Sequence, residues 1–189
     1  KKKPFFIVFE GVEGCGKSFQ SKRLFLNLRK KKIDPILTRE PGGTKSAELI
    51  RSLILKDYFK KSKKEKFDKY TDTLLYLGAR NEHVKNVIKP ALIKKKIIIC
   101  DRFIDSTIAY QVYGKKVKKS FIDHIHRYIL SGIKPNITFI LKVSPLAAKK
   151  KDWKKEKLKI DMINFLNLFI QKLKILFWKL PKIKKNISF

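Results

Sequence analysis

The residues with the clearest chemical meaning in this 189-residue chain form a glycine-rich loop, residues 11–18, with the sequence GVEGCGKS. The segment fits the pattern G-x-x-x-x-G-K-[ST], in which glycines let backbone N–H groups surround phosphate oxygens. In such a loop Lys17 reaches the terminal phosphates of a nucleoside triphosphate and the hydroxyl of Ser18 binds Mg²⁺. We expect the nucleotide to contact Gly11, Val12, Glu13, Gly14, Cys15, Gly16, Lys17, Ser18 and Phe19.

Two further segments combine charged residues with positions where ligands bind. Residues 38–44, TREPGGT, follow a short apolar run, and residues 101–103, DRF, follow the run 97–100. Ligands of open α/β sheets bind at the carboxyl ends of strands, where an aspartate can serve Mg²⁺ or an acceptor phosphate and an arginine can grip phosphate. Taken alone, each segment also fits a plain turn or a capped start of a helix.

The arginines mark the same places. Only seven of the 47 basic residues are arginine, and Arg39, Arg51, Arg80 and Arg102 lie in or near the segments just described. Arginine makes paired contacts to phosphate that lysine cannot reproduce. We therefore expect these four side chains to contact a phosphorylated substrate.

Alternating strand-like and helix-like segments must position these residues, and they predict an α/β domain with a parallel sheet. Strands are expected at 5–10, 36–38, 97–100 and 137–143, and helices at 17–30, 44–55, 72–87, 106–111, 120–130 and 158–179. Pro90 should kink or end its helix. The prediction is one three-layer P-loop NTPase domain over residues 1–189, with a five-stranded sheet whose last strand, at 187–189, is truncated.

Several phrases in the chain resemble the thymidylate kinase family, in the family's order and at similar spacing. They are FEGVEG at 9–14, TREPGGT at 38–44, LLYLGAR at 74–80, DRF at 101–103 and AYQ at 109–111, within a resemblance from about residue 5 to residue 145. The resemblance implies an ATP-dependent dTMP kinase, which transfers the γ-phosphoryl group of ATP to dTMP with Mg²⁺ in dTTP synthesis. The alternatives are a kinase for another nucleotide, or a degenerate P-loop protein that binds nucleic acid.

The resemblance also implies roles for individual residues. Tyr76 would stack on thymine, Tyr110 would crowd the 2′ position, and Asp101 with Ser18 would hold the metal. The implied substrate contacts are Glu13, Arg39, Arg51, Tyr76, Arg80, Arg102, Thr107, Tyr110 and Gln111. The implied catalytic residues are Lys17, Asp101, Arg102, Lys154 and Lys155. The alternatives are that Tyr76 and Tyr110 are ordinary core aromatics and that Thr107 simply occupies a helix start.

The chain departs from the family pattern in ways that bear on rate. Phe19 stands where the family usually has a hydroxyl residue, and no arginine occurs in the P-loop or after Arg127. A short lid is expected near residues 149–159, where Lys154 and Lys155 would supply positive charge without the planar fork of arginine. We expect a slow but active kinase. The family usually continues beyond the long C-terminal helix, so the chain is expected to be trimmed or covered by a partner.

Composition limits the other classes of function. No leader sequence or membrane-spanning run is evident, and Cys15 and Cys100 form no spaced pattern, so we expect a cytoplasmic protein. The formal net charge of +31 is spread over the chain in lysine pairs and triplets, which indicates a solvated surface but leaves incidental nucleic-acid binding open. By resemblance to the family we expect a homodimer formed through helices.

Overall fold

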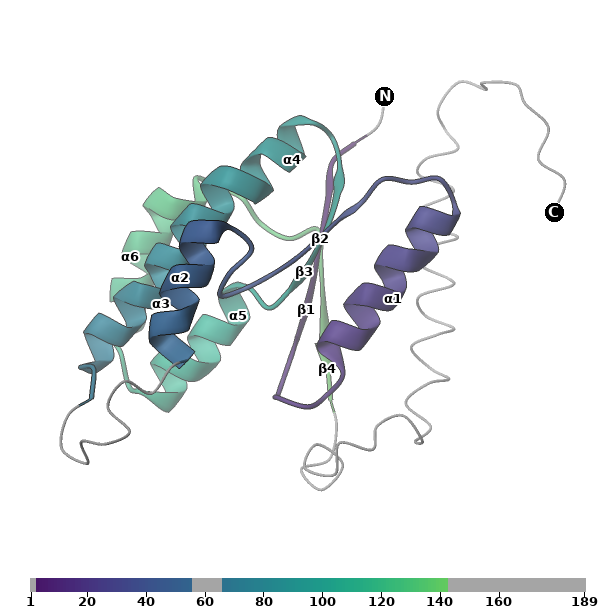
Figure 1. Cartoon of the computed structure of the whole chain (residues 1–189). Coiled ribbons are helices and arrows are strands. Elements are labelled where there is room, and N and C mark those ends of the chain that lie inside the picture. Colours follow the sequence, from purple (N-terminus) through teal and green to yellow (C-terminus); the bar gives the residue numbers. More distant parts are fainter. Residues whose placement is uncertain (1–2, 56–65, 143–189) are drawn as a thin grey trace, which may run out of the picture.

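A parallel sheet carries the fold (Figure 1), which we describe from a computed structural model for residues 3–55 and 66–142. Its strand order is β2-β3-β1-β4. The strands are β1 (Phe5–Gly11), β2 (Ile36–Arg39), β3 (Ile97–Asp101) and β4 (Ile137–Leu141). The helices are α1 (Lys17–Lys30), α2 (Lys45–Leu55), α3 (Lys69–His83), α4 (Lys89–Ile93), α5 (Ile104–Thr107) and α6 (Lys119–Leu130), with π-helical segments η1 (Val84–Ile88) and η2 (Ile108–Gly114).

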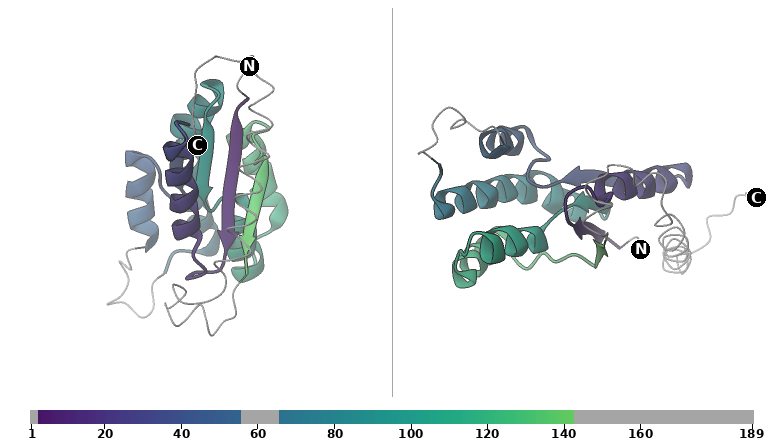
Figure 2. Two further views of the ribbon diagram at one scale, coloured as in Figure 1. Left: turned by 90° about the vertical axis from the view of Figure 1, so that its right-hand side faces the viewer. Right: turned by 90° about the horizontal axis from the view of Figure 1, so that it is seen from below.

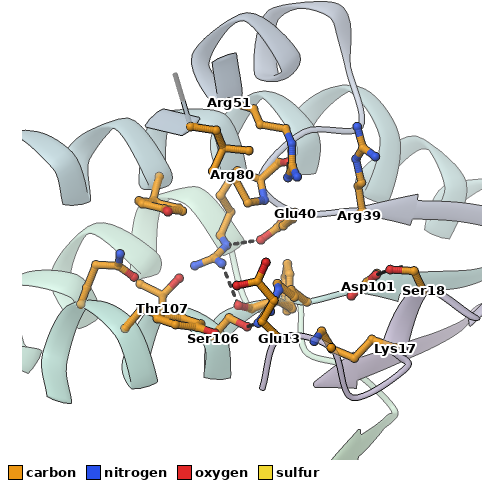
Figure 3. A pocket seen from close by; sticks show the side chains of 18 of the residues that line it. Glu13, Lys17, Ser18, Arg39, Glu40, Arg51, Arg80, Asp101, Ser106 and Thr107 are labelled. Carbon is orange, nitrogen blue, oxygen red and sulfur yellow. Dashed lines mark hydrogen bonds and ion pairs between the residues drawn. The ribbon is translucent and has the colours of Figure 1, made fainter. Parts of the chain in front are cut away.

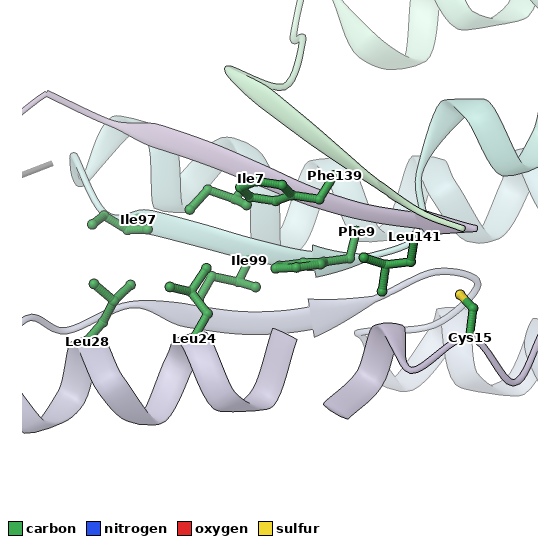
Figure 4. Packing of buried hydrophobic residues seen from close by; sticks show 9 residues of the cluster. All are labelled: Ile7, Phe9, Cys15, Leu24, Leu28, Ile97, Ile99, Phe139 and Leu141. Carbon is green, nitrogen blue, oxygen red and sulfur yellow. The ribbon is translucent and has the colours of Figure 1, made fainter. Parts of the chain in front are cut away.

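Alternating side chains of the strands fill two separate cores. Ile7 and Phe9 of β1 point toward α1, where they meet Leu24 and Leu28, which are spaced by about one helical turn (Figure 4). Phe6 and Val8 point to the opposite face, against the helices that follow β2 and β3. Burial on both faces explains why β1 is apolar without interruption from Phe5 to Phe9, as strands in parallel sheets are. Truncation of Leu24 to alanine is expected to cost about 2–5 kcal/mol.

The helices form the two outer layers. Figure 1 shows α1 on one face of the sheet and the remaining helices on the other, and the view from below in Figure 2 shows α2 outside α3. The α/β class, the parallel sheet and the flanking helices are thus confirmed. The predicted fifth strand at 187–189, the helix at 158–179 and the lid at 149–159 lie outside the described residues. Within the described ranges, no helix has both the length and the apolar character needed to cross a bilayer.

Pro90 was expected to kink or end its helix, and the second of these alternatives is wrong. A continuous helical run extends from Lys69 through η1 and α4 to Ile93, with Pro90 in the first turn of α4. The N–H of Lys89 bonds the carbonyl of Val84, five residues back. This wide π turn relieves the clash that a proline ring makes with the carbonyl four residues earlier, so the helix passes through.

Candidate active site

The strand register brings three loops together at one edge of the sheet. Asp101 at the end of β3 pairs with Phe9 of β1 on one side and with Arg39 of β2 on the other. The loops that follow these strands surround a cavity of about 560 Å³ (Figure 3). This edge is the place where ligands of open α/β sheets bind.

Most of the predicted site residues line this one cavity. They are Glu13, Gly14, Gly16, Lys17, Ser18, Phe19, Arg39, Arg51, Tyr76, Arg80, Asp101, Arg102, Thr107, Tyr110 and Gln111. Gly11, Val12 and Cys15 do not line it, because Gly11 ends β1, Val12 points to solvent and Cys15 packs in the core beneath the loop. Lys154 and Lys155 lie outside the described residues.

The P-loop is shaped by main-chain geometry. Gly11 has a φ of 139°, and a Cβ there would lie 2.6 Å from the carbonyl oxygen of Leu141, so no larger residue fits. Lys17 begins α1, and its Nζ donates to the carbonyl of Val12 at 2.7 Å across the loop. Backbone N–H groups at the start of α1 and the charge of Lys17 therefore face the same end of the cavity, as anion binding requires.

Ser18 and Asp101 form the polar centre of this end. The hydroxyl of Ser18 donates to Oδ2 of Asp101, which links α1 to the end of β3. The other carboxylate oxygen, Oδ1, is buried without a hydrogen-bond partner among the described residues. A buried carboxylate oxygen without a donor, next to a serine hydroxyl, is a donor set that suits Mg²⁺.

Arg102 is held in an unusual conformation beside the P-loop. Its φ of 71° lies in the left-handed region, which costs a residue with a side chain about 1–3 kcal/mol. Its Nη1 donates to the carbonyl of Gly11 at 3.2 Å and to the hydroxyl of Ser106 at 3.0 Å, and its guanidinium lies 5.4 Å from the ring centre of Tyr110. These contacts fix Arg102 between the P-loop and the helical segment that carries Tyr110.

Glu10 organises the turn that carries Arg102, a role not predicted from the sequence. The carboxylate of Glu10 is buried and accepts from the N–H of Phe103 at 2.7 Å, from the N–H of Ser106 at 3.1 Å and from the hydroxyl of Ser106 at 2.6 Å. An anion at the start of α5 is favourable for its exposed N–H groups. Ser106 was also missed, although its place two residues after α5 begins is typical of hydroxyl residues that bond locally.

A buried ionic cluster lies at the other end of the cavity. Nε of Arg80 donates to Glu40 at 2.7 Å, its Nη2 donates to the carbonyl of Phe103 at 2.9 Å, and its Nη1 lies 2.7 Å from Nε2 of His126. The second oxygen of Glu40 accepts from Nδ1 of His83 at 2.9 Å. Burial acts to raise the pKa of Glu40, but the charge of Arg80 and the bond from His83 outweigh it, so the pKa lies below its usual value.

Sequence reasoning identified Arg80 but not the residues that hold it. His83 lies three positions after Arg80 on one helix, so their spacing alone would have placed both on one face. Glu40 belongs to the TREPGGT segment but was not assigned a role. His126 comes from α6, more than forty residues further along the chain, and carries no local pattern that would have marked it.

The loop after β2 closes over this cluster. A Cβ at Gly43 would lie 2.6 Å from both Cδ2 of His83 and Oγ1 of Thr38, so only glycine lets the loop approach so closely. Arg51 of α2 donates to the carbonyl of Pro41 at 2.7 Å. Arg39 makes a paired contact with Glu48 at 3.1 and 3.2 Å. Arg39 is exposed and would have to leave Glu48 to bind an acceptor phosphate.

The remaining predicted residues line the deep part of the cavity. Thr107 and Gln111 are buried, whereas Tyr110 is about half exposed with a value of 47%. Tyr110 and Gln111 belong to η2, a π-helical segment of a kind that is frequent at functional sites. Burial, followed by the charge of Asp72, raises the pKa of the Tyr76 hydroxyl, so this group keeps its proton at neutral pH.

Comparison with known proteins gives one consistent result. The model of the thymidylate kinase family matches residues 9–188. A thymidylate kinase of Aster yellows witches'-broom phytoplasma is 46% identical over 140 residues, which cover 74% of this chain and 64% of that protein. A thymidylate kinase of a Wolbachia species from Brugia malayi is 44% identical over 165 residues, covering 86% of this chain and 76% of that protein.

A solved structure agrees with these matches. The crystal structure of thymidylate kinase from Ehrlichia chaffeensis superposes with a TM-score of 0.68 and 35% sequence identity, covering 90% of this chain and 98% of the other. The chain spans slightly less than two thirds of the length of several related proteins, at 64% for the phytoplasma enzyme. Because the family model matches nearly all of the chain and the P-loop, DRF and TREPGGT segments meet at one cavity, the chain belongs to the thymidylate kinase family.

Proposed function

We propose that the protein is a thymidylate kinase, which transfers the γ-phosphoryl group of ATP to dTMP and releases ADP and dTDP. The observation that carries the proposal is that one cavity is lined by the P-loop at one end and by Tyr76, Arg80 and Gln111 at the other. A donor nucleotide on Lys17 and an acceptor beside Arg102 would share this cavity. Such proximity is the main requirement of phosphoryl transfer, since the reaction needs positioning and charge neutralisation more than covalent chemistry.

Each end of the cavity has a distinct part in the proposed reaction. The P-loop N–H groups and Lys17 hold the terminal phosphates, whereas Arg102 and Arg39 hold the acceptor phosphate. The acceptor is already anionic at neutral pH, so no side chain has to remove a proton from it. Tyr76 and Tyr110 give the base and the sugar flat apolar surfaces, and Thr107 and Gln111 supply hydrogen bonds.

The proposed reaction uses Mg²⁺, and the residues present fit it. Ser18 and Asp101 would hold the ion, because Oδ1 of Asp101 is buried without a hydrogen-bond partner among the described residues. When bound, Mg²⁺ neutralises charge on the phosphate oxygens.

A comparison of acceptors tests the proposal. ADP formation would be measured with ATP and Mg²⁺ and with dTMP, dUMP, dCMP, dGMP, AMP or no acceptor. The Lys17→Met variant, purified in the same way, reports any contaminating kinase. We expect activity with dTMP to exceed that with the other acceptors. Preference for another monophosphate would refute the proposed base pocket, and folded protein that is inactive with every acceptor would refute the proposed reaction.

The proposal includes a homodimer in the cytoplasm. Leu49 and Leu53 of α2 lie one turn apart and are exposed, at 70% and 39%, on the outer layer of the fold. Apolar residues grouped on a helix surface are typical of interfaces between proteins. The buried thiols Cys15 and Cys100 are free, which suits a reducing compartment. Light scattering of the wild type and of Leu49→Glu should show a dimer and a monomer respectively.

A further inference from the structure

The guanidinium of Arg80 has more donors than the protein uses. It carries five N–H groups, and three have partners in the described part of the chain: Glu40, the carbonyl of Phe103 and Nε2 of His126. One N–H on Nη1 and one on Nη2 remain. Arg80 is 4% exposed and lines the cavity, so these two groups are available to a ligand that enters it.

The contact with His126 fixes the state of its imidazole. Arginine can only donate, so Nε2 of His126 must accept, and an accepting nitrogen carries no proton. His126 is therefore neutral, with its proton on Nδ1. Burial and then the charge of Arg80 lower its pKa to about 4, in agreement with this geometry. Glu40 also faces His126, and its negative charge, like that of Asp123 on the same helix, partly opposes this shift, whereas Lys119 adds to it.

The three anchors of Arg80 come from three separate parts of the fold. Glu40 follows β2, Phe103 follows β3, and His126 lies on α6. Glu40 and Phe103 hold Nε and Nη2, whereas His126 is the only partner of Nη1 within residues 3–55 and 66–142. Loss of the His126 contact would leave the rigid guanidinium plane with two anchors, so that the plane could tilt about the line that joins Nε and Nη2. By holding one N–H of Nη1, Nε2 of His126 thus determines which N–H groups of Arg80 remain for the ligand.

We propose that His126 is a positioning residue, whose unprotonated Nε2 holds Arg80 so that its two remaining N–H groups face the base of the acceptor nucleotide. The proposal deepens the proposed function and rests on it. A neutral acceptor suits this place because a carboxylate would neutralise Arg80 further and compete for the same N–H groups. A base with a carbonyl oxygen at this position would then be preferred to one with an amino group, since both groups of Arg80 donate.

Three variants separate positioning from packing. His126→Leu removes the acceptor at similar volume, and His126→Gln places an amide oxygen near the former Nε2. His124→Leu is the matched control, because His124 lies on the exposed side of the same helix and makes the same kind of contact to Arg127, at 3.0 Å. The dissociation constant for dTMP would be measured by calorimetry, and KM for both substrates by ADP formation.

We expect His126→Leu to raise the dissociation constant and the KM for dTMP about tenfold, with the KM for ATP changed less than about twofold, since the lost bond is to a charged donor. His126→Gln should restore most of the affinity, and His124→Leu should match the wild type. As the pH is lowered below about 5, the affinity of the wild type for dTMP should fall more steeply than that of His126→Gln, because a protonated Nε2 cannot accept a hydrogen bond from Arg80. The protonation of dTMP itself affects both proteins equally, so it cancels in the ratio of their dissociation constants.

A second measurement does not depend on dTMP. Nitrogen NMR of the wild-type protein at pH 7 should show the His126 imidazole with its proton on Nδ1 and none on Nε2. Because the measurement uses only the wild type, it can be made even if His126→Leu fails to fold. A proton on Nε2 would overturn the proposal, as would unchanged affinity for dTMP in folded His126→Leu. If the wild type phosphorylates another monophosphate but not dTMP, the base assignment fails, and the same variants are tested on that acceptor.

Discussion

The two ends of the cavity are built in different ways. At the P-loop end, backbone groups and the consecutive residues Lys17 and Ser18 line the cavity, and Nζ of Lys17 donates to the nearby carbonyl of Val12 at 2.7 Å and to Sγ of Cys15 at 3.6 Å. At the acceptor end, Arg80 is buried in contacts with Glu40, Phe103 and His126 from three distant segments. The first end is local main-chain geometry, and the second is a network of side chains.

Because of this difference, we expect substitutions at the two ends to affect catalysis and stability to different degrees. The contacts of Lys17, to the carbonyl of Val12 and to Sγ of Cys15, involve no carboxylate, so its loss should reduce catalysis more than stability. A member of the buried cluster leaves a charge without its partner, so its loss should reduce stability as well as binding. Four substitutions or conditions test this contrast, and we take them from the largest expected effect to the smallest.

Neutralising Glu40 should have the largest effect. The Glu40→Gln variant keeps the shape of the side chain but leaves the buried Arg80 without its counter-charge, and breaking a buried pair in this way costs about 3–5 kcal/mol. Urea unfolding should show this loss in the free energy of unfolding, together with a raised KM for the acceptor. Glu13→Gln is the matched control for stability, because Glu13 is exposed at the P-loop end. Equal stability of the two variants would remove the contrast between the ends.

Removal of Lys17 tests the opposite behaviour. Lys17→Met should lower kcat about a hundred- to thousandfold, as loss of one preorganised group facing transition-state charge does. Its stability should change by about 1 kcal/mol, since the carbonyl of Val12 and the weak acceptor Sγ of Cys15 lose a donor while no carboxylate loses its partner. Lys22→Met, on the exposed side of the same helix, should match the wild type in both measurements. A large loss of stability in Lys17→Met would show that the P-loop end is also held together by side chains.

The same contrast explains what could be predicted from the sequence. Residues 11–18 determine their own loop, because glycine geometry and the start of α1 act within a few positions. The β1, β2 and β3 strands are short apolar runs that end in Gly11, Arg39 and Asp101, and parallel pairing then brings these ends together. The α/β fold, the P-loop and the arginines of the cavity therefore followed from local patterns, whereas Tyr76, Thr107, Tyr110 and Gln111 were expected only from the resemblance to the thymidylate kinase family.

The rest depends on pairings that no local pattern encodes. Glu10 lies 96 positions from Ser106, and Arg80 lies 46 positions from His126. Histidine on an amphipathic helix is compatible with many environments, so α6 gave no reason to connect His126 with Arg80. The passage of the helix through Pro90 was missed for a related reason: the π turn at η1 that accommodates the ring has no clear sequence pattern.

Acidification should weaken the acceptor end in a defined range. The pKa of His126 is lowered to about 4 in the folded protein and is about 6.5 when unfolded. Between these values the imidazole is protonated in the unfolded chain but not in the folded protein. The free energy of unfolding therefore rises with pH, and the contribution of His126 is lost as the pH falls. We expect a loss of about 2 kcal/mol from pH 7 to pH 5. The pKa of Glu40 lies below 4.5, so its own contribution is lost only at lower pH.

Urea unfolding of the wild type and of His126→Gln at pH 7 and pH 5 measures this effect. The variant should lose about 2 kcal/mol less than the wild type over this range, because its amide does not titrate. The other histidines are common to both proteins and cancel in the difference. Parallel losses would show that His126 accepts a proton in the folded state without cost, which contradicts its contact with Arg80.

The smallest effect is expected at the junction of the two ends. Ser106 donates to Glu10 at 2.6 Å and accepts from Arg102 at 3.0 Å, and Arg102 also contacts the carbonyl of Gly11 in the P-loop. Ser106→Ala removes one donor from Glu10, which keeps its two backbone N–H bonds, so the free energy of unfolding should fall by only about 1 kcal/mol.

Kinetics of the same variant should locate its effect. Because Arg102 retains its bond to Gly11 but loses its support from Ser106, the KM for dTMP should rise severalfold while the KM for ATP stays constant. Ser106→Thr keeps the hydroxyl and should restore the KM for dTMP. If both KM values rise together, Arg102 couples the P-loop to the acceptor end, and the two regions act as one unit. If neither changes, Gly11 alone is enough to hold Arg102, and the main chain dominates at the junction as it does in the P-loop.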